Sequence, residues 1–390
     1  MRPIIPDSEF KERVAKIQAL MARDGYDMLL CYGNEAEPQY VRYLSDYWPS
    51  FETAGVIVPP EGEAFLLIGP ESRTFATDRS RLPQIRLLKA FRESSEPEYP
   101  GKPLDTFKSV FDELIGNRQI KKFGVAGMPL MTLFVHSELC DALEAHGCIP
   151  EKADDLVNSL RMIKTENELA CMREAGRITR LTMDYVIANI HPGMTECQVA
   201  GLGLAEMHRC GAERESYAPW VLTGDGSNQA ISRPRQKVIK AGDMTFLQFG
   251  ARYEGYASTI GRSVVYGQAT QQQRSLIEAG YELQERVLDT ISAGVPAAEV
   301  ARVHKETAYR LGYGEWLLYG PCHGNGLMEG EAPWIESNST YDLEENMTFC
   351  ACIFLGNTET KIGLRVEDVF RVTKGGHENL TAYPKELFVV

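Results

Sequence analysis

Three segments of the chain hold residue types that could do chemistry. They are QFGARYEGYASTIGR at 248–262, GPCHGNGLMEGEAP at 320–333 and GLRVEDVFRVT at 363–373. The second contains His323. The third contains Glu367 with Arg365 two residues before it, so the two charged side chains share one face of a strand. A histidine and a carboxylate can exchange protons with a substrate, and an arginine can pair with Glu367 or hold a substrate carboxylate.

Each of these residue types also has a structural interpretation. A glutamine in a hairpin is commonly a hydrogen-bonded packing residue, and a buried cysteine such as Cys352 usually behaves as a small hydrophobe. A thiolate at Cys352 would instead be a nucleophile or a metal ligand. Glu329 and Glu331 flank Gly330, and either carboxylate could supply an acid or a base.

The first segment needs a pair of strands to position it. DMTFLQFG and YASTIGRSVVYG predict two strands joined by ARYEG, and the alternation of residues places Phe246 and Gln248 on one face. The long helical pattern at 161–194 contains a capping box of Thr165 and Glu168, and Thr195 is the expected cap of the next helix.

The predicted secondary structure changes along the chain. Short β-rich runs and helical runs alternate over residues 1–150, which indicates an α/β domain. Strands dominate at 217–270 and again at 316–390, with two helical patterns between these regions.

The composition of the chain indicates which classes of partner and which cellular compartment to expect. The formal net charge is −13, and no Lys/Arg run is dense enough for a nucleic-acid or membrane-surface footprint. No apolar run approaches the roughly 20 residues of a membrane span, and no signal peptide is recognisable. The nine scattered cysteines are odd in number, which favours a reduced cytoplasmic enzyme over a disulfide scaffold.

In their order and spacing, RMIKTENELACMREA (161–175) and the segments at 248–262, 320–333 and 363–373 resemble the family of creatinase, prolidase, aminopeptidase P and methionine aminopeptidase. The resemblance covers essentially the whole chain. It implies an α+β fold, with an α/β creatinase/prolidase-like N-terminal domain over 1–157 and a catalytic domain of the "pita-bread" type over 158–390.

The resemblance also implies where a metal site would lie. In the metal-dependent members, two Asp, one His and two Glu hold two divalent cations. The corresponding residues here are Gln248, Thr259, His323, Cys352 and Glu367. The places of two assisting histidines are taken by Gly330 and Arg233. Since adjacent divalent cations need several carboxylate oxygens, we expect no two-metal site and no cofactor.

The resulting prediction is a metal-independent, creatinase-like hydrolase that acts on a C–N bond of a small polar compound, such as an amidine, an amide or a cyclic amino acid. One alternative is a metal-dependent Xaa-Pro dipeptidase or aminopeptidase with a mononuclear site, in which His323, Cys352 and Glu367 would form a zinc ligand set. Two others are a lyase acting on a small zwitterion and a non-catalytic ligand- or peptide-binding protein.

Residue roles follow from this interpretation. The expected catalytic residues are His323, Glu331, Cys352 and Glu367. The expected substrate-binding residues are Gln248, Thr259, Arg365, Arg233, Trp48, Phe51 and Glu52. The last three lie in DYWPSFETAG, where creatinase-like proteins send a loop into the neighbouring subunit, so the resemblance implies a homodimer with a shared site. We expect neither nucleic acid nor membrane as a partner.

Overall fold

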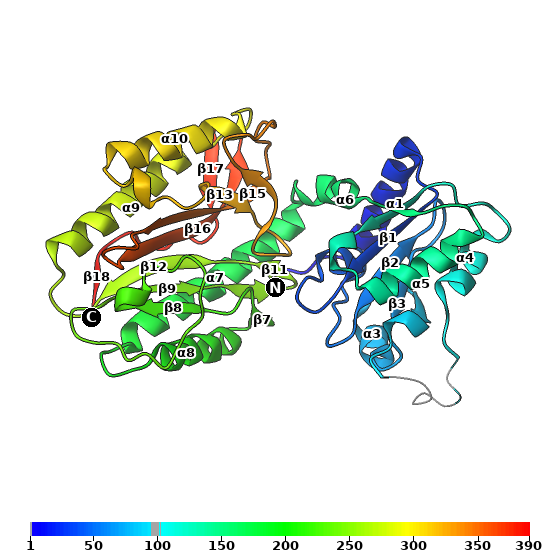
Figure 1. Cartoon of the computed structure of the whole chain (residues 1–390), viewed down its shortest axis with the longest axis horizontal. Coiled ribbons are helices and arrows are strands. Elements are labelled where there is room, and N and C mark those ends of the chain that lie inside the picture. The colour runs from blue at the N-terminus through cyan, green and yellow to red at the C-terminus, as the bar shows by residue number, and fades with distance from the viewer. Residues whose placement is uncertain (1, 95–100, 102) are drawn as a thin grey trace. The chain divides into compact units, whose positions relative to one another are not determined.

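The chain divides into two compact units, each described here by itself (Figure 1). The computed structural model describes residues 2–94, 101 and 103–390. The N-terminal unit spans Ile5–Arg161, and the C-terminal unit comprises Met162–Val390 together with residues 2–4. The expected boundary between residues 157 and 158 falls within the helix α6 (Asp154–Arg161), four residues before the observed division.

The N-terminal unit is a mixed sheet with helices packed against it. Its strands lie in the order β4-β3-β2-β1-β5-β6. The strand bounds are β1 (Met28–Gly33), β2 (Ala54–Val58), β3 (Phe65–Ile68), β4 (Gln84–Leu87), β5 (Phe123–Ala126) and β6 (Pro150–Lys152). The helices before α6 are α1 (Asp7–Asp24), α2 (Gln39–Ser45), α3 (Arg73–Arg79), α4 (Phe107–Ile115) and α5 (Leu133–Glu144), with 3-10 turns η1 (Lys89–Phe91) and η2 (Met128–Leu130). Phe107, Phe111 and Leu139 belong to the buried core that joins α4 and α5 to the sheet.

The C-terminal unit is built on a larger sheet, in which strands run in the order β14-β13-β15-β16-β12-β9-β8. The bounds are β8 (Trp220–Thr223), β9 (Met244–Phe249), β12 (Ile260–Val265), β13 (Cys322–Gly324), β14 (Glu331–Ile335), β15 (Thr348–Gly356), β16 (Gly363–Thr373), β17 (Gly376–Asn379) and β18 (Phe388–Val389). A smaller sheet contains β7 (Arg214–Glu215), β10 (Ala251–Tyr253) and β11 (Tyr256–Ala257).

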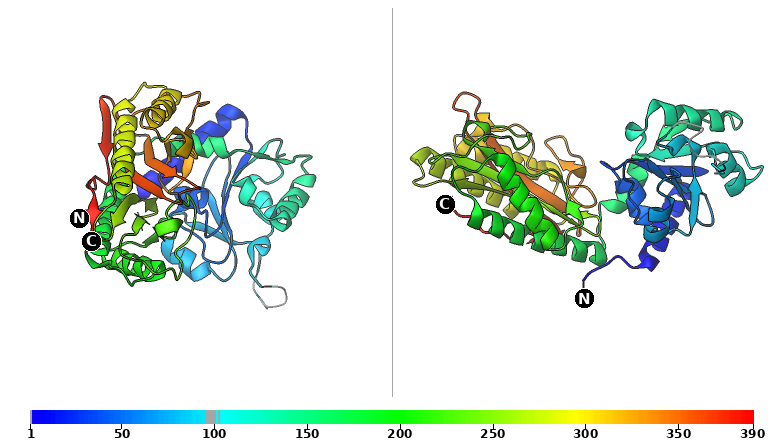
Figure 2. Two further views of the ribbon diagram at one scale, coloured as in Figure 1. Left: turned by 60° about the vertical axis from the view of Figure 1, so that its left-hand side comes forward. Right: turned by 90° about the horizontal axis from the view of Figure 1, so that it is seen from below.

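Two pairs of helices cover the face of this sheet that lies opposite the side chains of Gln248, Glu367 and Cys352 (Figure 2). The helices are α7 (Glu166–Asn189), α8 (Glu196–Arg209), α9 (Gln271–Thr290) and α10 (Ala297–Arg310), with 3-10 turns η3 (Gly224–Gly226) and η4 (Gly314–Trp316). The pair α7 and α8 packs on the half of the sheet around β8–β12, and α9 and α10 pack on the half around β14–β16. A glycine in each pair of helices allows close packing against this face. A Cβ on Gly280 of α9 would lie 2.0 Å from Leu364 Cδ2, and one on Gly203 of α8 would lie 2.0 Å from Phe249 Cε1. Any larger residue at either place would force helix and sheet apart.

The local predictions in this unit are partly confirmed. Thr165 with Glu168, and Thr195 with Gln198, form capping boxes at the starts of α7 and α8. The prediction of one continuous helix from residue 161 is wrong, because Thr165 is extended and caps a helix that begins only at Glu166.

The predicted turn ARYEG is likewise shorter than expected. Its first three residues form β10, and the reversal occurs at Glu254 and Gly255, both with positive φ. Among the described residues, no helix is long and apolar enough to cross a membrane.

Candidate active site

One row of directly paired residues crosses the centre of the large sheet. Trp220 of β8 pairs with Gln248, Gln248 with Gly261 of β12, Gly261 with Glu367 of β16, and Glu367 with Cys352 of β15. Residues paired in this way present their side chains to the same face. Gly261 contributes no side chain, and a Cβ there would meet the Glu367 Cβ at 3.0 Å. The glycine therefore leaves room for Glu367 at the middle of the row.

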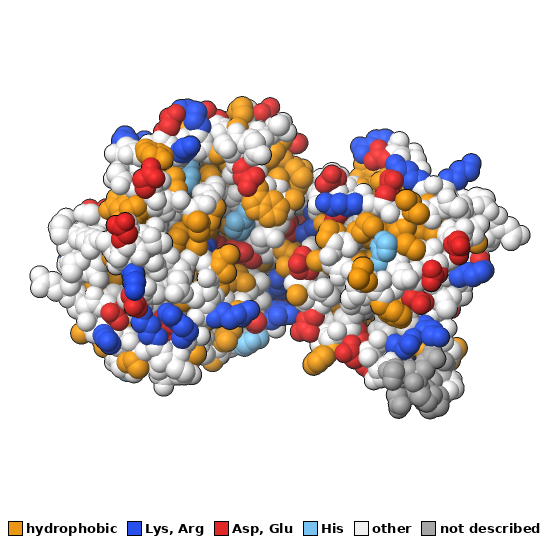
Figure 3. Space-filling view, in the orientation of Figure 1, with side chains coloured by type: hydrophobic (Ala, Val, Ile, Leu, Met, Phe, Trp, Pro, Cys, Tyr) orange, Lys and Arg blue, Asp and Glu red, His pale blue; other side chains and the backbone are white. Residues whose placement is uncertain are grey.

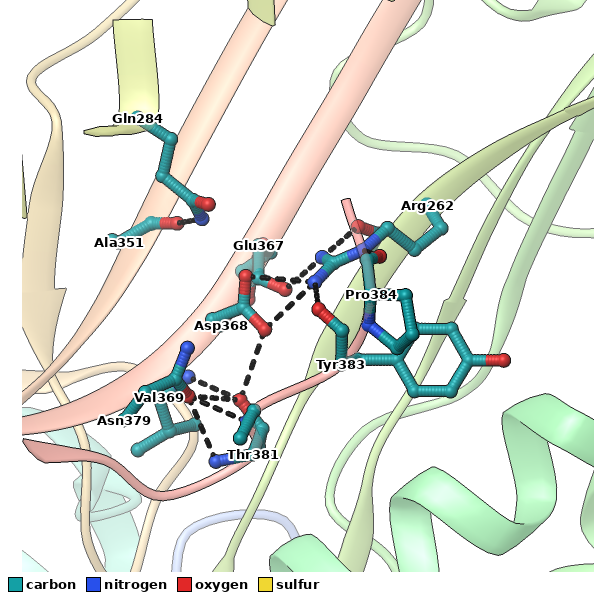
Figure 4. A network of polar contacts seen from close by, with 12 residues as sticks. Arg262, Gln284, Ala351, Glu367, Asp368, Val369, Asn379, Thr381, Tyr383 and Pro384 are labelled. Atoms are coloured by element: carbon teal, nitrogen blue, oxygen red, sulfur yellow. Dashed lines mark hydrogen bonds and ion pairs between the residues drawn. The ribbon is translucent and has the colours of Figure 1, made fainter. Parts of the chain in front are cut away.

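The opposite face of β16 is anchored by a buried ion pair (Figure 4). Arg262 Nη2 donates to both carboxylate oxygens of Asp368 at 3.0 Å, and both side chains are fully buried. Arg262 also donates to the backbone carbonyls of Glu367, Tyr383 and Pro384. These bonds join β12 to β16 and to the C-terminal segment, so Arg262 holds the register that directs Glu367 to the other face.

A buried guanidinium occupies one half of that other face. Arg365 Nη1 donates to Cys352 Sγ at 3.0 Å and to Glu367 Oε2 at 3.2 Å, and Nη2 donates to the Ala230 carbonyl at 2.6 Å. Its Cζ lies 4.7 Å from the centre of the Trp220 ring. Burial lowers the pKa of Arg365, but its neighbours, Glu367 among them, raise that pKa above its usual value. We therefore treat this residue as a permanent positive charge in an aromatic enclosure.

Cys352 belongs to the guanidinium side of the cavity. Its thiol hydrogen-bonds to the Tyr319 hydroxyl at 3.3 Å as well as accepting from Arg365. Burial is the main cause that raises the pKa of the Cys352 thiol well above its usual value. The uncharged thiol is a hydrogen-bond partner in this arrangement, and its predicted role as a nucleophile stays a prediction.

Gln248 lies beside Glu367, and Thr259 lies beside Gln248, with Thr259 Oγ1 3.4 Å from Gln248 Nε2; their roles in substrate binding stay predictions. Gln248 Nε2 donates to Glu367 Oε2 at 2.8 Å, and its Oε1 is buried without a hydrogen-bond partner among the described residues. Thr259 Oγ1 lies 2.6 Å from the Tyr217 hydroxyl. Both side chains are neutral, so they contribute no charge toward a cation.

The other half of the face gathers possible metal ligands. His323, Glu329, Cys350 and Glu367 each offer a ligand atom, and these atoms all lie within 4.8 Å of one another. His323 Nε2 is 3.7 Å from Glu329 Oε1, and about a fifth of each of these two side chains is exposed. Glu367 and Cys350 are fully buried.

The two carboxyl groups of this cluster influence each other. Burial, followed by the negative charge of Glu367, raises the pKa of Glu329 well above its usual range. Burial also acts to raise the pKa of Glu367, but Arg365 and His323 outweigh it and hold that pKa below its usual value. The pKa values of the two carboxyl groups are therefore driven apart, as expected for two acids that share a buried site.

Glu331 serves a different purpose from its neighbour Glu329. Its Oε1 lies 3.1 Å from Lys164 Nζ, and its Oε2 accepts from the Met328 backbone amide at 3.1 Å. Both side chains of the ion pair are buried. Glu331 therefore anchors the loop that carries Glu329, which places it as a positioning residue, while its predicted catalytic role stays a prediction.

A cavity of about 320 Å³ opens onto both halves of the site. Its walls include Tyr217, Trp220, Ile231, Tyr319 and Trp334. Hydrophobic side chains gather at the surface in the region of β13–β15 (Figure 3). The cavity is thus an apolar chamber with a charged floor, which is typical of small-ligand sites.

The other predicted substrate-binding residues do not line this cavity. Arg233 is exposed in the loop that follows Ile231. In the N-terminal unit, the Trp48 ring lies 3.9 Å from the Arg42 guanidinium, and Glu52 is buried and accepts from the Glu71 amide at 3.2 Å. Phe51 is 85% exposed. Whether any of these residues meets a substrate stays a prediction.

The donor set decides which metal complement fits. A pair of adjacent divalent cations does not fit, because Gln248 and Thr259 are neutral and Arg365 already carries a positive charge at Cys352. A single cation does fit. Glu367 Oε1 is buried and has no hydrogen-bond partner among the described residues, which leaves a carboxylate oxygen available beside a histidine, a second carboxyl and a thiol.

Glu329 and Cys350 were not predicted as members of such a set. The sequence indicated Glu329 only as an acid or a base, and it indicated no role for Cys350, which forms a C-x-C pair with Cys352. The register of His323 opposite Cys350 was the missing information, since the sequence does not state which strands pair.

Known proteins resemble this chain in sequence and in fold. The family model of "Metallopeptidase family M24" matches residues 170–374. The Xaa-Pro dipeptidase of Pyrococcus furiosus is 26% identical, over 97% of this chain and 99% of that protein. The Xaa-Pro dipeptidase of Pyrococcus horikoshii is 27% identical, over 96% and 98% respectively.

Solved structures confirm the expected α+β fold. The structure of the Pyrococcus horikoshii OT3 prolidase superimposes with a TM-score of 0.82 at 24% identity, covering 97% of this chain and all of that one. An X-Pro aminopeptidase from Thermotoga maritima gives a TM-score of 0.84 at 25% identity, covering 97% of this chain and 99% of that one.

These matches overturn the prediction of a metal-independent, creatinase-like hydrolase. The full-length relatives are named Xaa-Pro dipeptidases, and the matching family is one of metallopeptidases, which favours the alternative of a metal-dependent peptidase with an altered site. The physical reason for the error lies in the donors. Counting only the positions implied by the resemblance missed Glu329 and Cys350, which the fold brings to His323 and Glu367.

The match over more than half of the chain, together with the shared fold, shows the family. This chain belongs to metallopeptidase family M24, the family of prolidase and aminopeptidase P, and is a hydrolase of C–N bonds.

Proposed function

We propose that this protein is a metal-dependent peptidase of the Xaa-Pro type, which cleaves the bond before proline in small peptides with a single divalent cation. The observation that carries the proposal is the gathering of His323, Glu329, Cys350 and Glu367, of which His323 and Glu329 line an apolar cavity. The names of the full-length relatives supply the substrate class.

His323, Glu329 and Glu367 would hold the cation with nitrogen and oxygen donors. A bound divalent cation supplies a polarised carbonyl and an activated water. Arg365 keeps Glu367 ionised, and Gln248 orients it by donating to Oε2, so that Oε1 is free to bind.

The cavity walls account for a small apolar substrate. Trp220, Tyr319 and Trp334 offer aromatic surface on which the ring of a proline can pack. Such packing removes apolar surface of both rings from water, which favours binding. The volume of about 320 Å³ lies at the lower end of ordinary ligand pockets, roughly 300–1,000 Å³, and suits a short peptide.

The test combines metal depletion with peptide assays. Protein dialysed against EDTA should lose its activity on Ala-Pro and Met-Pro, and stepwise addition of Zn²⁺, Co²⁺ or Mn²⁺ should restore it. Ala-Ala serves as the comparison substrate. Hydrolysis that survives complete chelation, or no Xaa-Pro hydrolysis with any of these metals, would contradict the proposal.

A homodimer with a site completed by the partner is the second part of the proposal. Phe51 supports it, because its side chain is exposed while its backbone has a positive φ of 63° and its amide donates to Glu35 Oε2 at 3.0 Å. A held loop that exposes a phenylalanine is suited to contact another chain. Sedimentation of the wild type and of Phe51→Ser should give a dimer and a weakened dimer respectively, and a wild-type monomer would exclude this part.

We also propose a cytoplasmic location for this protein. All nine cysteines are free, which supports a reducing compartment. Localisation of a tagged protein tests it.

A further inference from the structure

Cys350 occupies a place from which its sulfur can reach the cation. It lies on β15 directly opposite His323 and is fully buried. Its Sγ is 3.8 Å from the Glu329 carbonyl oxygen, so the thiol also contacts the backbone of the loop that carries another member of the cluster. A free cysteine among apolar neighbours alone would be a packing residue, but this one lies among a histidine and two carboxyl groups.

Cys352, two residues along the same strand, provides the contrast. Its Sγ is engaged by Arg365 Nη1 at 3.0 Å and by Tyr319 at 3.3 Å. It is not a member of the cluster of ligand atoms, whereas Cys350 is. The two cysteines of the C-x-C pair therefore face different surroundings, one a guanidinium and the other a set of donors.

Glu367 supplies an independent sign that a ligand belongs at the cluster. Its Oε2 is used by both Gln248 and Arg365, while its Oε1 is buried without a partner among the described residues. A buried carboxylate oxygen left without a partner is costly, and a cation would satisfy it.

We propose that Cys350 is a ligand of the single cation, together with His323, Glu329 and Glu367, and that this sulfur makes the site selective for Zn²⁺ or Co²⁺ over Mn²⁺ and Mg²⁺. On binding, the S–H bond of Cys350 breaks, its proton passes to solvent, and the thiolate sulfur forms the bond to the metal. Thiolate ligands prefer zinc and cobalt, whereas sites with only carboxylate and water suit magnesium and manganese. This inference rests on the metal dependence proposed above and adds the identity of the metal.

Cobalt spectroscopy tests the ligand directly. Metal-free protein titrated with Co²⁺ should develop a thiolate-to-cobalt charge-transfer band in the near ultraviolet, saturating at one equivalent. Cys350→Ser should lose this band. Cys352→Ser, the matched control on the same strand, should keep it. Zn²⁺ should displace the bound Co²⁺, and a large excess of Mn²⁺ should not.

Several outcomes would overturn the inference. They are a wild-type cobalt spectrum without a charge-transfer band, a band that disappears in Cys352→Ser but persists in Cys350→Ser, or equal competition by Mn²⁺. If Cys350→Ser fails to fold, X-ray absorption of the zinc-loaded wild type decides, because one sulfur neighbour is expected and none would refute the inference. A thiolate band without Xaa-Pro hydrolysis would leave this inference standing and refute the proposed function, and manganese-supported hydrolysis without the band would do the reverse.

Discussion

The two halves of the candidate site lie on the same face of one sheet, yet they differ in how their polar groups are hydrogen-bonded. In the guanidinium half, Arg365 is shared among Cys352, Glu367 and the Ala230 carbonyl, and Tyr319 closes over the thiol. In the donor half, His323 and Glu329 stay partly exposed, and one oxygen of Glu367 has no partner among the described residues.

The difference separates structure from function. Polar groups that satisfy one another mainly stabilise the fold, whereas a buried carboxylate oxygen without a partner beside a histidine, a second carboxyl group and a thiol is suited to bind a cation. Glu367 belongs to both halves, since Oε2 faces the guanidinium and Oε1 is left free. Changes in the first half should therefore appear mainly in stability, and changes in the second mainly in metal binding and activity.

Removing the buried charge of the guanidinium half should have the largest effect. Arg365→Met leaves Glu367 buried without its charged partner, which we expect to reduce the free energy of unfolding by about 3–5 kcal/mol. Urea unfolding measures this loss. Arg302→Met, which breaks an exposed pair with Glu299, is the control and should cost about 0–1 kcal/mol. Equal losses in the two variants would erase the distinction between the halves.

Glu367→Gln should remove the shared carboxylate. We expect the affinity for the cation and kcat/KM on Xaa-Pro peptides to fall by about 100-fold or more, because the loss of a direct ligand should exceed that of an outer-shell partner. Calorimetric metal titration and peptide assays measure the two quantities. Glu359→Gln, an exposed carboxylate in the loop after β15, should leave both unchanged. Undiminished metal binding by Glu367→Gln would place the cation elsewhere.

Gln248→Met should have an intermediate effect on stability. It removes the 2.8 Å hydrogen bond to Glu367 Oε2, and hydrogen bonds to charged groups contribute about 1.5–3 kcal/mol. Urea unfolding again gives the measurement, with the exposed Gln271→Met as a control expected within about 0.5 kcal/mol of wild type. A variant as stable as wild type would show that the hydrogen bond from Arg365 alone is enough to stabilise Glu367 Oε2 in the buried site.

Arg233→Gln should have the smallest effect. An exposed arginine that holds a substrate carboxylate in solvent contributes about 1 kcal/mol or less, so KM should rise only a few-fold with kcat unchanged. Steady-state kinetics of this variant beside the exposed Lys240→Gln tests the prediction. Identical KM values for both variants and the wild type would remove Arg233 from the substrate-binding residues.

The sequence by itself determined the local structure and the family. The capping box at Thr165, the expected cap at Thr195 and the strand alternation around Gln248 predicted elements that the structure contains. The placement of Gln248 beside Glu367 followed from segments whose order and spacing resembled a known family. Such features depend on short-range chemistry, in which neighbours along the chain decide the outcome.

Only the tertiary structure decided which donors meet. Glu329 and Glu331 are two residues apart, but one lies beside His323 and the other is held by Lys164, from the start of the C-terminal unit. Cys350 and Cys352 share a strand face, and the strands and loops around them give one a set of donors and the other a guanidinium. These assignments depend on the pairing register of β13, β15 and β16, and residues far apart in the chain set that register through packing, which the sequence pattern alone does not state.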